Sequence, residues 1–362
     1  MSTLGARLME QVRSAGAMGA TRLGLGTVSR ASRARKKLDS ALAGLDSGAV
    51  QRILEQHPEI QGPSLPIGQA ILNARRHAPE KGMDALATVQ ALLAAGADPN
   101  GPVGLPDLSP LGRCLDVAQN GFWSEEVRAA HRAMAALLVQ QGADFGVPDA
   151  KGRWPLHWAA ALGDAQFFDL LVSRGADLSA LDREGCSALF LAAAHDHPDV
   201  ALRALASHNN VAKTSFYGET ALHRSAVNAD AALCEVFLDH GALVNAQNDA
   251  GNAALHRAAV AGALEACLVL LGQGADLALA NEDQHTPLHL AAKSGQGDVC
   301  ALLIERGAPV HALDSEGRTP KGLARDEGHA HIAPLIDACW SAAQARQAVE
   351  TMIAGAARGL RP

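Results

Sequence analysis

Aromatic residues are scarce in this sequence. They make up 3% of its 362 residues, and Tyr217 is the only tyrosine. Hydrophobic residues nevertheless reach 48%, so small aliphatic side chains supply most of the apolar surface. Such a composition favours many small contacts over one large core built around aromatic rings. No apolar run approaches the roughly 18 residues that a transmembrane helix needs, and we expect no membrane span.

Motifs typical of catalysis or metal binding are also missing. The sequence has no Gly-rich loop ending in Lys-Ser/Thr, no Gly-x-Ser-x-Gly turn and no His-Glu-x-x-His pair. The compact pairs His195-Asp196-His197 and His329-Ala330-His331 have no evident third ligand, whereas a zinc ion takes three or four. We therefore expect no enzymatic activity, no cofactor, no metal and no small-molecule substrate.

The cysteines indicate a reducing compartment. Cys234, Cys267 and Cys300 are evenly spaced along the chain, in segments that read as helices. Neighbouring helices pack about 8 to 10 Å apart, whereas a disulfide needs Cα atoms within about 7 Å. We expect free, buried thiols and a cytoplasmic protein.

The sequence is rich in one repeated pattern. Thr286-Pro287-Leu288-His289 recurs in variant form from positions 154, 187, 220, 253 and 319, so that one constant interval separates successive starts five times running. A Gly-Ala pair follows four of these starts at a second constant distance, as at Gly307-Ala308. A fixed period of this length, about 33 residues, indicates stacked supersecondary units.

Each unit is predicted to be a turn followed by two short helices. Thr286 suits a helix N-cap, and Pro287 suits the first helical position because it has no N–H to leave unpaired. A second amphipathic helix follows, and Gly307 ends it in the left-handed conformation that glycine tolerates. The period and the Thr-Pro-Leu-His pattern resemble the ankyrin repeat. The resemblance implies an all-α solenoid of about eight helix-turn-helix repeats with β-turn or hairpin loops, expected to be monomeric.

The repeat pattern divides the chain into six segments. In two repeats of the first half, the closing Gly-Ala-Asp mark lies ten and twelve residues farther from the repeat start than it does in the other repeats. This predicts insertions near residues 77–83 and 120–132. We interpret the aromatic pair in the second insert as a plug or a partner anchor. The predicted segments are a basic arm (1–37), a capping half-repeat (38–60), two irregular repeats (61–145), five regular repeats (146–313), a capping repeat (314–342) and a terminal helix and tail (343–362).

The first 37 residues carry a net charge of +7, which leaves −14 on the rest of the chain. This arm is typical of a disordered, solvated tail, although it also resembles an organellar transit peptide. An alternative is the N-terminal address of a secreted or translocated bacterial effector whose repeats bind a host protein. Phosphate contacts from the arm would support nucleic-acid binding, but the acidic body argues against it.

The remaining hypothesis is recognition of another protein. The resemblance implies that His157, His223, His256 and His289 brace adjacent turns. Bracing should be weaker where another residue replaces the histidine, at Phe190, Gly322, Gly68 and Gly112. The resemblance also implies that partners contact the hairpin tips and the concave face of the first helices. Carried over position by position, the candidate contacts are Arg153, Arg183, Glu184, His195, Phe216, Tyr217, Asn228, Asp249, Glu282, Asp283, His285 and Lys293.

Overall fold

The computed structural model describes residues 30–76, 82–102, 109–149, 151–207 and 211–359. The chain divides into two compact units, one up to residue 149 and one from residue 150. The described residues of both units form helices, joined by turns, and contain no strand. The predicted all-α repeat solenoid is confirmed. No helix of the described part is long and apolar enough to span a membrane.

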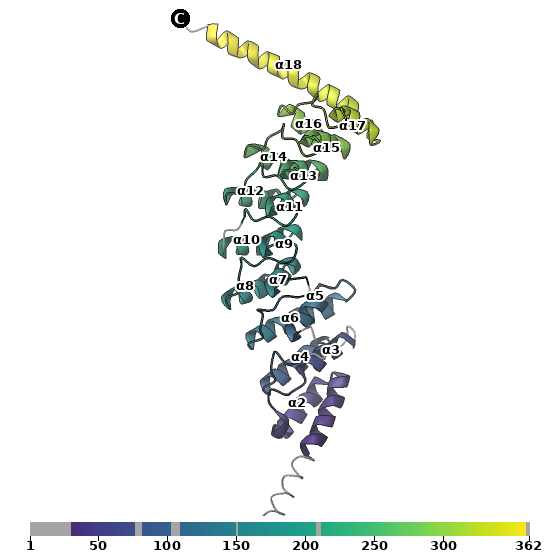
Figure 1. The fold of residues 1–362 in the computed structure, drawn as a ribbon, viewed down its shortest axis with the longest axis vertical. Helices are drawn as coiled ribbons and strands as arrows, with labels where there is room; N and C mark the ends of the chain where they lie inside the picture. Colours follow the sequence, from purple (N-terminus) through teal and green to yellow (C-terminus); the bar gives the residue numbers. More distant parts are fainter. Residues whose placement is uncertain (1–29, 77–81, 103–108, 150, 208–210, 360–362) are drawn as a thin grey trace, which may run out of the picture. The chain divides into compact units, whose positions relative to one another are not determined.

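In the first unit, helices pair along the chain (Figure 1). A helix covers residues 30–44. It is followed by α2 (Ser47–Gln56), the short η1 (Pro58–Ile60), α3 (Ile67–Arg76), α4 (Gly82–Ala94), α5 (Pro110–Gln119) and α6 (Glu125–Gln140). Helix α4 packs between α2 and α6, and α3 contacts both α4 and α5.

The helix over residues 30–44 differs from the expectation that the arm extends to residue 37. Ala34, Leu38 and Leu42 recur every four residues and are buried, so they form one apolar helical face. The Asn73 amide of α3 donates to the Leu42 carbonyl oxygen at 2.9 Å. This packing starts regular structure before the predicted boundary, whereas the predictions for residues 1–29 lie outside the described residues.

The two predicted inserts have different outcomes. Residues 77–81 lie outside the described residues. The second insert, predicted over residues 120–132, is a loop only as far as Ser124, because α6 begins at Glu125. Helix α6 has 16 residues, and its buried side chains include Met134 and Leu138. Much of the inserted sequence therefore lengthens the second helix of its repeat.

The second unit is a regular stack of helix pairs (Figure 1). Each first helix packs on the next first helix, and buried alanines such as Ala258 and Ala291 allow the close approach. The first helices are α7 (Pro155–Leu162), α9 (Ala188–Ala194), α11 (Ala221–Val227), α13 (Ala254–Ala261), α15 (Pro287–Lys293) and α17 (Pro320–Asp326). The second helices are α8 (Ala165–Ser173), α10 (Pro198–Ser207), α12 (Ala231–Asp239), α14 (Leu264–Gly272), α16 (Gly297–Glu305) and α18 (Ile332–Gly359).

Helix α18 closes the second unit. It runs for 28 residues, so the predicted border between residues 342 and 343 falls inside one continuous helix. Its first turns pack on α16 and α17, where Ile332 and Ile336 are buried. Farther along α18, Arg346 still contacts Glu305 of α16 at 3.2 Å, and the C-terminal end of the helix extends away from the stack (Figure 1).

Candidate protein-interaction surface

The hairpin tips of the second unit are built by one recurring turn. Asp182, Asn248, Asn281 and Asp314 occupy the same position in their repeats, with Ser215 at the equivalent place. The Oδ1 atom of Asn248 accepts from the Ala250 and Asn252 backbone N–H groups at 3.1 and 2.9 Å. The other three make the same pair of bonds. Local side-chain bonding of this kind fixes the shape of each tip.

Successive tips are joined by backbone hydrogen bonds into a ladder. The Phe216 N–H donates to the Glu184 carbonyl oxygen at 2.8 Å, and the Asp249 N–H donates to that of Tyr217 at 3.0 Å. The same bond links Arg183 to Lys151, Glu282 to Ala250 and Ser315 to Asp283, at distances of 3.0 to 3.2 Å. The tips are therefore held at a fixed spacing along the stack.

At three of the tips, glycine lets a side chain of the next tip lie across it. Gly185 has φ of 74°, and a Cβ atom there would lie 2.8 Å from the Phe216 ring. Gly218 has φ of 69°, and a Cβ atom there would lie 2.6 Å from the Asp249 carboxylate. Both the positive φ and the contact require glycine. Arg183, Phe216 and Asp249 thus form a row over three successive glycines, whereas at Gly251 the backbone of the next tip makes the close approach.

The first helices are braced behind the tips by histidines, as the ankyrin resemblance implied. His256 Nδ1 accepts from the Ala253 backbone N–H at 3.1 Å, and its Nε2 atom lies 3.2 Å from the His285 carbonyl oxygen. Since one ring nitrogen accepts and the other donates, the ring is held as the neutral tautomer. His157, His223 and His289 make the equivalent two bonds.

Burial keeps these histidines uncharged. It lowers the pKa of His256 to about 4, even though the bond to the His285 carbonyl acts in the opposite sense. Burial also lowers the pKa values of His223 and His289. A neutral buried ring that is bonded at both nitrogens is a structural link, so these histidines have no role at the surface.

Two buried carboxylates also belong to the frame. The Glu219 carboxylate lies 2.9 Å from Arg224 Nε and 3.4 Å from an Arg257 guanidinium nitrogen. The Asp314 carboxylate pairs with Arg318 Nε at 2.9 Å. Although burial acts against it, the hydrogen bonds to Arg318 lower the pKa of Asp314 to about 2.

Most of the predicted contact residues lie where the position-by-position reading puts them. His195 and Lys293 are exposed at the ends of first helices. On the tips, Phe216 and Tyr217 each expose 69% of their surface. The other exposed tip residues from the prediction are Arg183, Glu184, Asp249, Glu282 and Asp283.

Three predicted contact residues are engaged within the fold. His285 is only 5% exposed, and its Nε2 atom lies 3.4 Å from the Asp314 carboxylate; the placement of His285 on the accessible surface is therefore wrong. The Asn228 amide donates to the Ala193 carbonyl oxygen at 2.9 Å. The Arg153 guanidinium lies 3.8 Å from the ring centre of Trp158.

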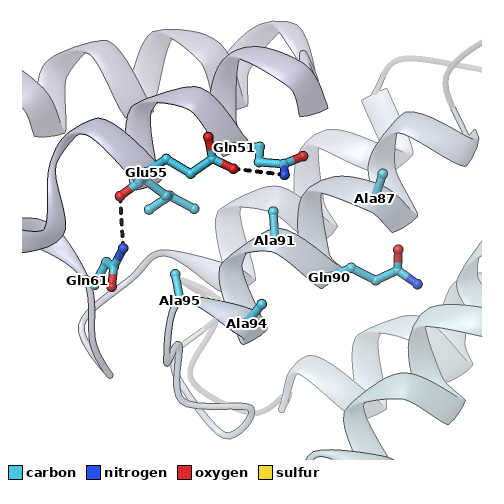
Figure 2. Close-up of a pocket in the computed structure, with 9 residues that line it drawn as sticks. Gln51, Glu55, Gln61, Ala87, Gln90, Ala91, Ala94 and Ala95 are labelled. Atoms are coloured by element: carbon cyan, nitrogen blue, oxygen red, sulfur yellow. Dashed lines mark hydrogen bonds between the residues drawn. The ribbon is translucent and has the colours of Figure 1, made fainter.

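Two further features lie outside the list of predicted contact residues: the aromatic pair of the second insert, and a pocket that the sequence did not predict. Phe122 is 85% exposed and meets Trp123 edge to face at 5.4 Å, so its ring does not cover the helix ends as a plug. A pocket of about 420 Å³ lies between α2 and α4. The Gln51 amide in its wall donates to the Glu55 carboxylate at 3.0 Å, and a dashed line marks this bond in Figure 2. Alanines four residues apart in α4 were the pocket's only sequence signal. Its lining is Gln51, Leu54, Glu55, Gln61, Ala87, Gln90, Ala91, Ala94 and Ala95.

Neither of these features brings catalytic groups together. Glu55 is the only ionisable residue that lines the pocket. In the described ranges, no group of three or more His, Cys, Asp or Glu side chains is arranged to hold a metal ion. All six cysteines are free thiols, and burial raises the pKa of Cys267 and Cys300 to about 12. Thiols of this kind are inert.

Comparison with known proteins agrees with the architecture. A family model described as ankyrin repeats (3 copies) matches residues 127–211, 201–281 and 255–339. Neurogenic locus notch homolog protein 1 of Xenopus tropicalis is 36% identical over 126 residues, which cover 34% of this chain and 5% of that protein. The protein of the same name from Mus musculus is 38% identical over 119 residues, or 32% of this chain and 5% of its own length. The matched stretch is thus a small part of these relatives.

Proposed function

This chain belongs to the ankyrin repeat family, whose repeats are protein-interaction modules and generally not enzymes, and we propose that it binds a partner protein through the hairpin tips of its second unit. The proposal assigns the central contact to Phe216 and Tyr217. It covers the tips from Arg183 to Asp283, together with the exposed ends of α9 and α15 at His195 and Lys293.

The exposure of the aromatic pair carries this proposal. Two aromatic side chains exposed at 69% are costly to leave in water in a chain whose aromatic content is only 3%. Tyrosine and phenylalanine offer a large contact area with few rotatable bonds, and tyrosine adds a hydrogen-bonding hydroxyl. The backbone bonds from Glu184 to Phe216 and from Tyr217 to Asp249 hold the pair in place before a partner arrives. Preorganisation of this kind lowers the entropic cost of binding.

Affinity capture with a matched control tests the proposal. The full chain, a Phe216→Ala/Tyr217→Ala variant and a Leu243→Ala variant are each used to capture partners, which are identified by mass spectrometry. Leu243 is 71% exposed and lies in the turn after α12, outside the set of tip residues named above. We expect the aromatic variant to lose a partner that the Leu243→Ala variant retains. Equal recovery by all three chains contradicts the proposal.

A further inference from the structure

Three exposed carboxylates follow the aromatic pair along the row of tips. Asp249 belongs to the next tip, and Glu282 and Asp283 belong to the tip after it. In the part of the chain that the structure describes, none of the three pairs with a lysine or arginine. Within the described ranges, the ionic contact that these three side chains make is between Asp283 and His285, at 4.0 Å. Their negative charge is therefore left to solvent.

The geometry of the ladder places this charge beside the aromatic pair. The Asp249 N–H donates to the Tyr217 carbonyl oxygen, and the Glu282 N–H donates to the Ala250 carbonyl oxygen. The Asp249 carboxylate lies across Gly218, one residue after Tyr217. On the other side of the pair, the preceding tip carries Arg183 and Glu184, whose charges oppose each other. Negative charge thus gathers on one side of the aromatic pair.

The cations of the neighbouring first helices are already paired. Arg224 and Arg257 both contact Glu219, whose side chain is 7% exposed. Lys293 of α15 contacts Glu327 at 3.6 Å, and Arg318, which precedes α17, contacts Asp314 at 2.9 Å and Glu316 at 3.0 Å. Among the described residues of the same repeats, these pairs leave no arginine directed at the three carboxylates, so a ligand must supply the complementary charge.

We infer that the partner presents an extended segment in which one bulky apolar residue has arginine or lysine residues to one side of it. This inference rests on the proposed function. The apolar residue lies against Phe216 and Tyr217, and the basic residues lie over Asp249, Glu282 and Asp283. Opposite charges arranged in this way speed the encounter and select against acidic segments.

The repeat spacing sets the distance between these groups. Neighbouring helices of the stack lie about 8 to 10 Å apart, and extended chain covers about 3.3 Å per residue. One repeat therefore corresponds to about three residues of bound chain. The basic residues should stand about three and about six positions from the apolar anchor.

A binding measurement with defined peptides tests this inference on the full chain. The probe is a fluorescent peptide with one leucine and arginines about three and six residues away, and a second peptide carries glutamates in place of the arginines. The test variant is Asp249→Asn/Glu282→Gln/Asp283→Asn. The control variant is Glu235→Gln/Asp239→Asn/Glu265→Gln, which removes the same charge from exposed positions of α12 and α14.

We expect fluorescence anisotropy to report binding of the arginine peptide that weakens about tenfold in the test variant and falls as salt rises. The control variant should bind as the unchanged chain does. Equal weakening in both variants, or equal binding of the glutamate peptide, overturns the inference. Binding of a synthetic peptide of residues 1–37 in place of the arginine peptide assigns the surface to this chain's own basic arm and also overturns it.

The same variants separate this inference from the proposed function. In the affinity capture, loss of the partner from the Phe216→Ala/Tyr217→Ala variant alone, with full recovery by the charge-removed test variant, retains the tips as the binding surface and rejects a basic partner. If neither variant loses the partner, both the proposed function and this inference are rejected.

Discussion

The two units hold neighbouring repeats together in different ways. From residue 151 on, each repeat is linked to the next by a tip-to-tip backbone bond, and most are also linked by a buried histidine such as His256. In the unit up to residue 149, Gly68 and Gly112 occupy the histidine positions. Its two irregular repeats are linked by the bond from the Asp144 N–H to the Asn100 side chain at 2.7 Å, and the second unit has the equivalent bond from the Asp276 N–H to the Asn245 side chain at 2.9 Å.

Helix length differs along with the bonding. Helices α4 and α6 of the first unit have 13 and 16 residues, whereas α8, α12, α14 and α16 have nine each. Longer helices bury more apolar side chain per repeat, and this burial stabilises the stack. In the second unit, polar bracing sets the spacing of the tips, and a recognition surface needs such a fixed spacing.

Acidification should produce the largest difference between the units. The pKa of His256 is lowered to about 4 by burial, and those of His223 and His289 are lowered as well. Between about pH 4 and the unfolded value of about 6.5, the unfolded chain therefore binds more protons. The stabilisation is complete above about pH 6.5 and is lost as the pH falls through about 4.

At about 1.4 kcal/mol per pKa unit, the lowered pKa of His256 alone means that acidification reduces the free energy of unfolding by on the order of 3 kcal/mol. Hydrogen exchange followed by mass spectrometry should show α13 and α15 losing protection between pH 7 and pH 4.5. Amides of α4 and α6, whose repeats lack the bracing histidine, should lose less. Equal loss in the two units contradicts the assigned role of the histidines.

Removing one brace is expected to have the next largest effect. His256→Ala leaves the Ala253 N–H and the His285 carbonyl without their partner and opens a cavity, which together cost about 2 to 3 kcal/mol of unfolding free energy. The matched control is His240→Ala, because His240 is exposed at the end of α12. It should change stability by less than about 0.5 kcal/mol. Urea denaturation monitored by circular dichroism measures both, and similar midpoints for the two variants would count against the brace.

The tip ladder can be broken at a glycine. Gly251→Ala should cost about 1 to 3 kcal/mol, because φ is 75° there and the new Cβ atom would lie 2.8 Å from the Glu282 backbone nitrogen. Gly272→Ala, in α14, meets no atom within 4 Å and should gain about 0.5 to 1 kcal/mol. Thermal unfolding should shift in opposite directions, and shifts of the same sign would contradict the ladder.

The smallest expected effect concerns a polar link at the helix ends. Asn228→Ala removes the bonds to the Ala193 and Ala194 carbonyl oxygens and should cost about 1 kcal/mol. Asn228→Asp keeps the shape but cannot donate, so it should cost at least as much. Partner affinity in the capture experiment should follow stability. A loss of binding with no loss of stability would return Asn228 to the contact surface.

The sequence predicted the features that repeat, and missed those that depend on one tertiary contact. The period located the first helices, the bracing histidines and the exposed tip at Phe216, because each follows from position within the repeat. His285 occupies a tip position, but its side chain is buried against the Asp314 carboxylate of the next repeat. The early helix before Leu38 and the lengthened α6 depend on packing partners distant in sequence, which no periodicity reports.

Site-specific photocrosslinking tests the central claim most directly. Benzoylphenylalanine replaces Tyr217 in one full-length chain and Leu243 in another, since both positions are similarly exposed. The two chains are irradiated with the partner found by affinity capture. Crosslinking from position 217 and not from position 243 is the predicted result. Crosslinking from position 243 alone, or from neither position while the partner stays bound, would contradict the assignment of binding to the hairpin tips.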